Sequence, residues 1–151
     1  MTSASASPVR DLVCCSRLSS VLDIGANPID GDPPYKAMLE SGLCTVTGFE
    51  PQGDALAELQ RRKGPLENYL PHAVGDGESH RLKITQASGM TSLLTPDPKR
   101  LRLFNGFPEW GKVIDEVDVQ THRLDEIDAV PDFDLLKIDI QGGELMVFQN
   151  G

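Results

Sequence analysis

The sequence predicts an α/β fold, in which a mostly parallel sheet has helices on both of its faces. Short apolar segments typical of buried strands alternate with segments of helical character. Glycine and proline residues stand at the ends of these segments, where they stop a strand or a helix. The chain has 151 residues, of which 39% are apolar, enough to bury the core of one domain.

The first half of the chain alternates regularly between strands and helices. Pro33 and Pro34 fit only the first turn of the first helix, and Gly42 is placed to end it. Gly64 and Pro65 stop the second helix in the same way. The expected elements are strands over 20–25, 45–50 and 68–74 and helices over 33–41 and 54–63.

The second half begins with a β-rich insertion. Leu82 and Ile84 alternate with polar residues over 81–86, which is typical of a half-exposed antiparallel strand. A loop with one short helix is expected over 95–110, a further alternating strand over 116–121 and one helical turn over 124–127. The most apolar strand of all, over 135–140, then returns to the parallel sheet and is followed by a helix over 143–149.

The expected domain covers residues 20–151. Residues 1–19 are predicted to be a flexible segment that ends in a lead-in helix over 11–18. A nucleotide-binding sheet of this class usually has more strands than those expected here. The C-terminal strands are therefore missing because the chain is truncated, or the sheet edge is completed in another way.

Charge and composition exclude several functions. A net charge of −9 argues against a nucleic-acid partner. No apolar run has the length of a membrane span, and no signal peptide is recognisable, so no membrane partner is expected. The three cysteines form no Cys-x-x-Cys pair and the three histidines are scattered. We therefore expect a cytoplasmic protein without a metal site.

In parallel sheets of this kind, ligands bind at the carboxyl ends of the strands. The loop after the first strand contains Asp23, Gly25, Ala26 and Asn27, and its Gly-Ala pair lets a ligand approach the backbone closely. It is neither a dinucleotide fingerprint nor a P-loop, so a ligand without phosphates is favoured. The alternative is a plain tight turn.

Glu50 ends the second strand, where a carboxylate can accept hydrogen bonds from both hydroxyls of a ribose. The alternative is an acid that caps the next helix. The glycine turn after the first strand and the acid after the second together describe a nucleoside site.

Strand alternation places Lys137, Asp139 and Gln141 on one side of the last strand. Charged groups in so apolar a strand need partners, either each other or groups across the sheet. Asp139 is near the carboxyl end and is expected to face the crevice, with a structural ion pair as the alternative. His72 is a candidate base on a strand near the same crevice, although a structural role is more common.

Six stretches of the chain together resemble the FkbM-type methyltransferases, which are class I enzymes that depend on S-adenosylmethionine. The stretches follow the order found in that family and cover residues 21–27, 49–51, 73–76, 90–93, 121–127 and 134–144. The resemblance implies a Rossmann-like fold. It also implies methyl transfer to a hydroxyl oxygen of a sugar or another small molecule, so the expected partner is a small-molecule or glycan acceptor.

The resemblance also implies roles for individual residues. The loop of Asp23, Gly25, Ala26 and Asn27 would hold the amino-acid part of the cofactor, and Glu50 would bind its ribose. Ala73, Val74 and Asp76 would lie near the adenine. Asp139 would lie close to the methyl group, and Asp139 or His72 would take the proton of the acceptor. Many family members have Glu where this chain has Gln141.

Two other functions remain open at this point. The first is a non-catalytic or truncated nucleoside-binding domain of the same fold. The second is a nicotinamide-dependent oxidoreductase, against which the missing phosphate-binding glycines argue.

Overall fold

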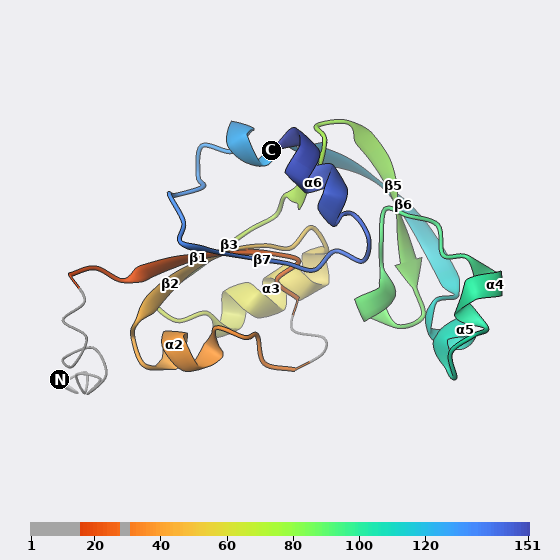
Figure 1. Ribbon diagram of the computed structural model, residues 1–151, viewed down its shortest axis with the longest axis horizontal. Helices are drawn as coiled ribbons and strands as arrows, with labels where there is room; N and C mark the ends of the chain where they lie inside the picture. The colour runs from red at the N-terminus through yellow and green to blue at the C-terminus, as the bar shows by residue number, and fades with distance from the viewer. Residues whose placement is uncertain (1–15, 28–30) are drawn as a thin grey trace.

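The computed structural model of the chain describes residues 16–27 and 31–151. Its main sheet is parallel and has the strand order β3-β2-β1-β7. Helices α2 and α3 cover one face of this sheet, and α6 lies over the other (Figure 1). The predicted α/β class is therefore confirmed. The bounds are β1 Ser19–Ile24, α2 Lys36–Glu40, β2 Cys44–Phe49, α3 Gly53–Arg62, β3 Glu67–Leu70, β7 Leu135–Ile138 and α6 Glu144–Asn150.

A second sheet has the order β4-β6-β5 and extends to one side of the main sheet (Figure 1). Strands β5 (Ser79–Thr85) and β6 (Val113–His122) form the antiparallel pair that the alternating pattern predicts. They are joined by a 3-10 turn, η1 (Ser88–Met90), and by two short helices where one was expected. These helices are α4 (Pro98–Leu101) and α5 (Phe107–Trp110). A further 3-10 turn, η2 (Leu124–Glu126), follows β6 as predicted.

The predicted strand over 68–74 is wrong as a single element. The chain leaves the main sheet after Leu70, and Ala73–Val74 form β4, which pairs in parallel with β6. Pro71 explains the break, because it has no backbone N–H to give to a sheet. This break sends the chain from the first sheet to the second.

Other predicted bounds also shift, and two of these shifts have a clear local cause. Helix α2 begins at Lys36 because Pro33, Pro34 and Tyr35 form a turn before it. Strand β7 ends at Ile138, two residues earlier than predicted, because the chain then turns through positive φ at Gln141 and Gly142. The lead-in helix expected over 11–18 falls mainly outside the described residues.

The central strands are buried on both faces, which explains their nearly continuous apolar character. Leu22 and Ile24 of β1 pack with Phe49 of β2 and Val147 of α6 on one face. On the other face, Val21 and Val46 pack with Tyr35, which immediately precedes α2. The main core therefore lies directly beneath the carboxyl ends of β1 and β2.

An ion pair inside the main sheet joins β1 to β7. Asp23 is only 1% exposed and stands opposite Lys137 in the strand register. Lys137 Nζ lies 2.9 Å from Asp23 Oδ1, and the Tyr35 hydroxyl donates to Asp23 Oδ2. Burial raises the pKa of Asp23, while the hydrogen bond from Tyr35 and the positive charge of Lys137 oppose that rise. Of the partners considered for Lys137, the partner found is Asp23 across the sheet.

We expect Lys137→Met to destabilise the protein by about 3–5 kcal/mol, because it leaves the buried Asp23 without its counter-charge. The double variant Asp23→Asn/Lys137→Met should recover much of this loss, since it removes both charges. Urea unfolding measures both effects. The exposed Lys112→Met is the control and should change stability by less than about 0.5 kcal/mol. A loss as small as that of the control would contradict the account of the pair.

Candidate functional site

A cavity lies at the carboxyl ends of β1, β2 and β7, where the second sheet meets the first. It encloses about 780 Å³ of empty space, which includes space open to solvent. Its wall comes from both sheets and from the loops that follow their strands. The residues that line it are Ile24, Gly25, Asn27, Phe49, Glu50, Pro51, Gln52, His72, Ala73, Val74, Leu82, Ser88, Gly89, Thr91, Ser92, Leu93, Asp139, Ile140 and Gln141.

Most of the predicted site residues meet in this wall. The wall includes Gly25, Asn27, Glu50, His72, Ala73, Val74 and Asp139. Three other predicted residues are not part of it. Asp23 is buried in the ion pair with Lys137, Ala26 packs with Leu59 and Tyr69, and Asp76 is held in a turn of the second sheet. The predicted ligand contacts of these three residues stay predictions.

The loop after β1 is held against both neighbouring strands. The amides of Gly25 and Ala26 donate to the carbonyl of Phe49 at 3.2 and 3.0 Å. Lys137 Nζ donates to the carbonyl of Gly25 at 2.7 Å. Gly25 has a φ of +81°, and a Cβ atom there would lie 2.1 Å from the carbonyl oxygen of Asp139. Only glycine therefore fits this turn.

Glu50 is a buried carboxylate in the cavity wall, and its residue is 2% exposed. Its Oε1 accepts a hydrogen bond of 2.8 Å from the backbone amide of Gln52. Burial raises the pKa of Glu50, and the hydrogen bond from Gln52 and the charge of Lys137 oppose this rise. A buried acid that lines a cavity is suited to accept hydrogen bonds from a ligand.

The loop after β7 carries a contact that sequence reasoning missed. Gln141 has a φ of +57°, which is uncommon for a residue with a side chain. Its Nε2 donates to Asp139 Oδ1 at 3.0 Å, and its carbonyl accepts a hydrogen bond of 2.8 Å from the Ser92 hydroxyl. Ser92 thereby joins the second sheet to the Asp139 loop across the cavity. The only signal in the sequence was the resemblance of residues 90–93 to the family.

His72 lies in the cavity wall between two other rings. Its ring centroid is 6.4 Å from that of Phe49 and 4.6 Å from that of His122, which meets it edge-on. Burial lowers the pKa of His72, and the neighbouring His122 lowers it further. The neutral ring, which can accept a proton, is therefore favoured near neutral pH.

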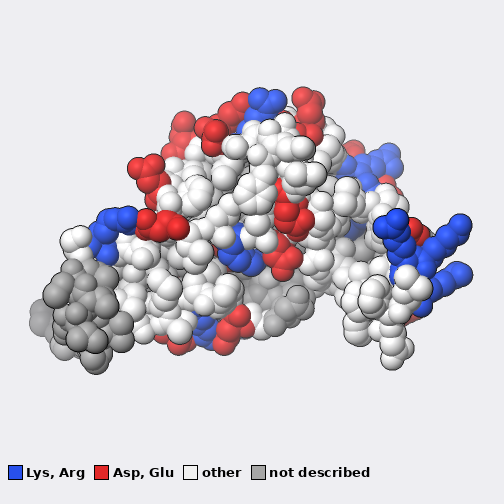
Figure 2. All heavy atoms as spheres, in the orientation of Figure 1, with Lys and Arg blue, Asp and Glu red and all other residues white. Residues whose placement is uncertain are grey.

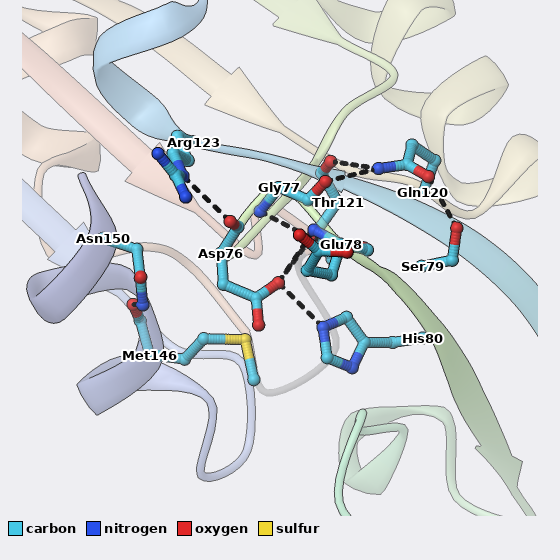
Figure 3. A network of polar contacts seen from close by, with 10 residues as sticks. All are labelled: Asp76, Gly77, Glu78, Ser79, His80, Gln120, Thr121, Arg123, Met146 and Asn150. Carbon is cyan, nitrogen blue, oxygen red and sulfur yellow. Dashed lines mark hydrogen bonds and ion pairs between the residues drawn. The ribbon is translucent and has the colours of Figure 1, made fainter.

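Asp76 is the centre of a polar network in the second sheet (Figure 3). Its Oδ1 lies 2.8 Å from His80 Nε2, and it accepts hydrogen bonds from the Glu78 amide and from Thr121 Oγ1. The hydrogen bond with His80, followed by that from the Glu78 amide, lowers the pKa of Asp76 to about 2. Its carboxylate therefore stabilises the turn between β4 and β5.

Two further properties concern the described residues alone. No group of three or more His, Cys, Asp or Glu side chains within them is placed to hold a metal ion. No helix among them has both the length and the apolar character that a membrane crossing requires.

A comparison with protein families decides the relationship of this chain. The sequence model of one family, the methyltransferase FkbM domain, matches residues 23–151 of the chain. The chain belongs to the FkbM methyltransferase family. Searches of curated proteins and of solved structures each returned no significant match. The matched range of the FkbM domain contains every residue of the cavity wall.

We expect Gly25→Ala to destabilise the protein much more than Gly42→Ala, the matched control. Both glycines have positive φ, but a Cβ at Gly42 meets no atom within 4 Å, whereas one at Gly25 clashes with the Asp139 backbone. The control should lose about 1–2 kcal/mol through backbone strain alone. Urea unfolding of both variants measures the difference, and equal losses would contradict the close approach of Gly25 to Asp139.

The low pKa of Asp76 predicts a pH-dependent contribution to stability. Because this pKa lies below the ordinary value of 3.8, the contribution is present above about pH 4 and is lost as the pH falls through about 2. Asp76→Asn should therefore be less stable than the wild type near neutral pH, and the difference should shrink in acid. Urea midpoints measured over a pH series test this. Asp118→Asn, at a highly exposed position, is the control, and a difference that does not change with pH would refute the prediction.

Proposed function

We propose that this chain binds S-adenosylmethionine in the cavity and transfers its methyl group to a hydroxyl oxygen of a sugar or another small molecule. Membership of the FkbM methyltransferase family supports methyl transfer. The observation that carries the cofactor assignment is Glu50, a buried acid in the cavity wall. One of its carboxylate oxygens, Oε1, accepts a hydrogen bond from the backbone amide of Gln52. A buried free thiol, Cys44, suits a reducing compartment such as the cytoplasm.

The charge of the wall supports this cofactor over a dinucleotide. The described residues that line the cavity include the acids Glu50 and Asp139 and no Lys or Arg. An acidic wall favours a ligand with a positive sulfonium centre and disfavours a pyrophosphate. The same charges argue against the nicotinamide-dependent alternative.

The residues of the wall fit the parts of this cofactor. Glu50 is proposed as the acceptor for the ribose hydroxyls, since it is a buried acid that lines the cavity. Ala73 and Val74 offer an apolar surface for the adenine. The backbone of Gly25 and Asn27 offers a close approach for the amino-acid part, because the turn at Gly25 has no side chain.

The cofactor supplies a methyl group that is already activated by the adjacent positive sulfur. The protein then has three tasks, which are to align the acceptor hydroxyl, to exclude water and to take the hydroxyl proton. Asp139 and His72 both line the cavity and are the two candidates for the base. Gln141 orients the Asp139 carboxylate, and burial favours the neutral, proton-accepting form of His72 by lowering its pKa.

We expect Glu50→Gln to weaken S-adenosylmethionine binding by about 1–3 kcal/mol, or roughly 5- to 150-fold in Kd, because the charged acceptor for the ribose is lost. Calorimetric titration of the folded variant measures this. The exposed Glu40→Gln is the matched control and should bind as the wild type does. Unchanged affinity in a folded Glu50→Gln protein would exclude the ribose contact.

The transfer step is tested separately with a panel of hydroxylated acceptors and isotopically labelled cofactor. Incorporation of label into an acceptor, lost in Asp139→Asn or in His72→Gln, identifies the base. Cofactor binding without any transfer to the panel would favour the non-catalytic nucleoside-binding domain instead.

A further inference from the structure

The far end of the second sheet carries an exposed apolar surface. We call residues 98–112 the tip; they comprise α4, α5 and the turns beside them. Leu103, Phe104 and Trp110 of the tip are 78%, 58% and 49% exposed. None of the residues of the tip lines the cavity. Trp110 is therefore neither a core residue nor part of the cavity wall.

The tip is an ordered structure with its own packing. The ring centroids of Phe104 and Phe107 are 5.2 Å apart, and those of Phe107 and Trp110 are 5.4 Å apart. The Leu101 side chain packs so closely over Gly111 that a Cβ there would lie 2.6 Å from it. These contacts give Phe104 and Trp110 a packed support, and Leu103 is next to Phe104 in the chain.

Positive charge surrounds these apolar side chains. Residues 98–112 contain four basic residues, Lys99, Arg100, Arg102 and Lys112, and one acidic residue, Glu109, in a chain with a net charge of −9. Figure 2 shows Lys and Arg side chains projecting from the end of the molecule at which Figure 1 shows α4, next to uncharged side chains. Arg100 forms a 3.4 Å ion pair with the neighbouring Asp97, and its side chain is still 85% exposed.

We propose that the tip docks on the surface of an anionic lipid bilayer. Leu, Phe and Trp side chains enter the headgroup region readily, and nearby Lys and Arg residues bind anionic headgroups. The acidic remainder of the protein is repelled by the same surface, so the charge distribution favours contact through the tip alone. The sequence-based expectation of no membrane partner rested on the absence of a spanning segment, which peripheral docking does not require.

Co-sedimentation with lipid vesicles tests this proposal. We expect the wild-type chain to bind vesicles of phosphatidylcholine mixed with phosphatidylglycerol, to bind much less to phosphatidylcholine alone, and to be released by salt. Failure to bind the anionic vesicles, or equal binding to both compositions, would overturn the proposal.

Variants separate the tip from the rest of the surface. Leu103→Ser/Phe104→Ser should weaken vesicle binding at least about tenfold through lost apolar burial. Arg100→Gln/Arg102→Gln should weaken it by about fivefold for each charge removed. The matched controls are Leu145→Ser/Phe148→Ser, at equally exposed positions of α6, and Arg61→Gln/Arg62→Gln in α3. Thermal melts followed by circular dichroism verify that all four variants are folded.

Two further outcomes would overturn the assignment to the tip. One is an equal loss of vesicle binding in the control variants, which would show a diffuse contact. The other is a change of oligomeric state in Leu103→Ser/Phe104→Ser, seen by sedimentation velocity without any effect on vesicle binding. That result would assign the tip to contacts between copies of the chain.

Discussion

The ion pair between Asp23 and Lys137 connects the parts of the protein on which the cavity depends. It joins β1 to β7 inside the sheet, and the same Lys137 ammonium group holds the carbonyl of Gly25. The hydrogen bond from the Tyr35 hydroxyl to Asp23 connects the segment that precedes α2 to the same ion pair. A buried pair of this kind contributes little net stability compared with an apolar pair, but the loss of one partner is costly. Its main effect is therefore to fix the position of the Gly25 loop.

The second constraint is the connection between the two sheets. Pro71 ends the third strand of the main sheet, and β4 then starts the second sheet beside the cavity. Ser92, from the second sheet, reaches the carbonyl of Gln141, while Gln141 holds the carboxylate of Asp139. Residues at the ends of β2, β4 and β7 therefore line the same cavity. Two of them, Glu50 and Asp139, are 89 residues apart in the sequence. Their relative positions depend on the pairing of the strands and on the hydrogen bonds of Ser92 and Gln141.

The features that the sequence predicted well are those with a local cause. Apolar runs identified β1, β2 and β7, and the glycine turn and Glu50 fell at strand ends where parallel sheets bind ligands. Alternation of Leu82 and Ile84 identified β5 as antiparallel. The features that it missed have non-local causes. The partner of Lys137 is determined by strand order, and the roles of Ser92 and Gln141 depend on two loops meeting across the cavity. The hydrogen bonds of Asp76 with Thr121 and His80 likewise depend on contacts across the second sheet and its turn, while its place near the adenine, implied by the family resemblance, stays a prediction.

Nuclear magnetic resonance of the ¹⁵N-labelled chain during titration with S-adenosylmethionine tests the central claim most directly. We expect the largest amide shifts at Gly25, Asn27, Glu50 and Val74, which line the cavity. The hollow between α2 and α3, lined by Leu39, Gly42 and Leu66, provides the internal comparison and should change little. Shifts concentrated at that hollow, or no shifts at saturating cofactor, would contradict the assignment of the cavity at the carboxyl ends of the strands.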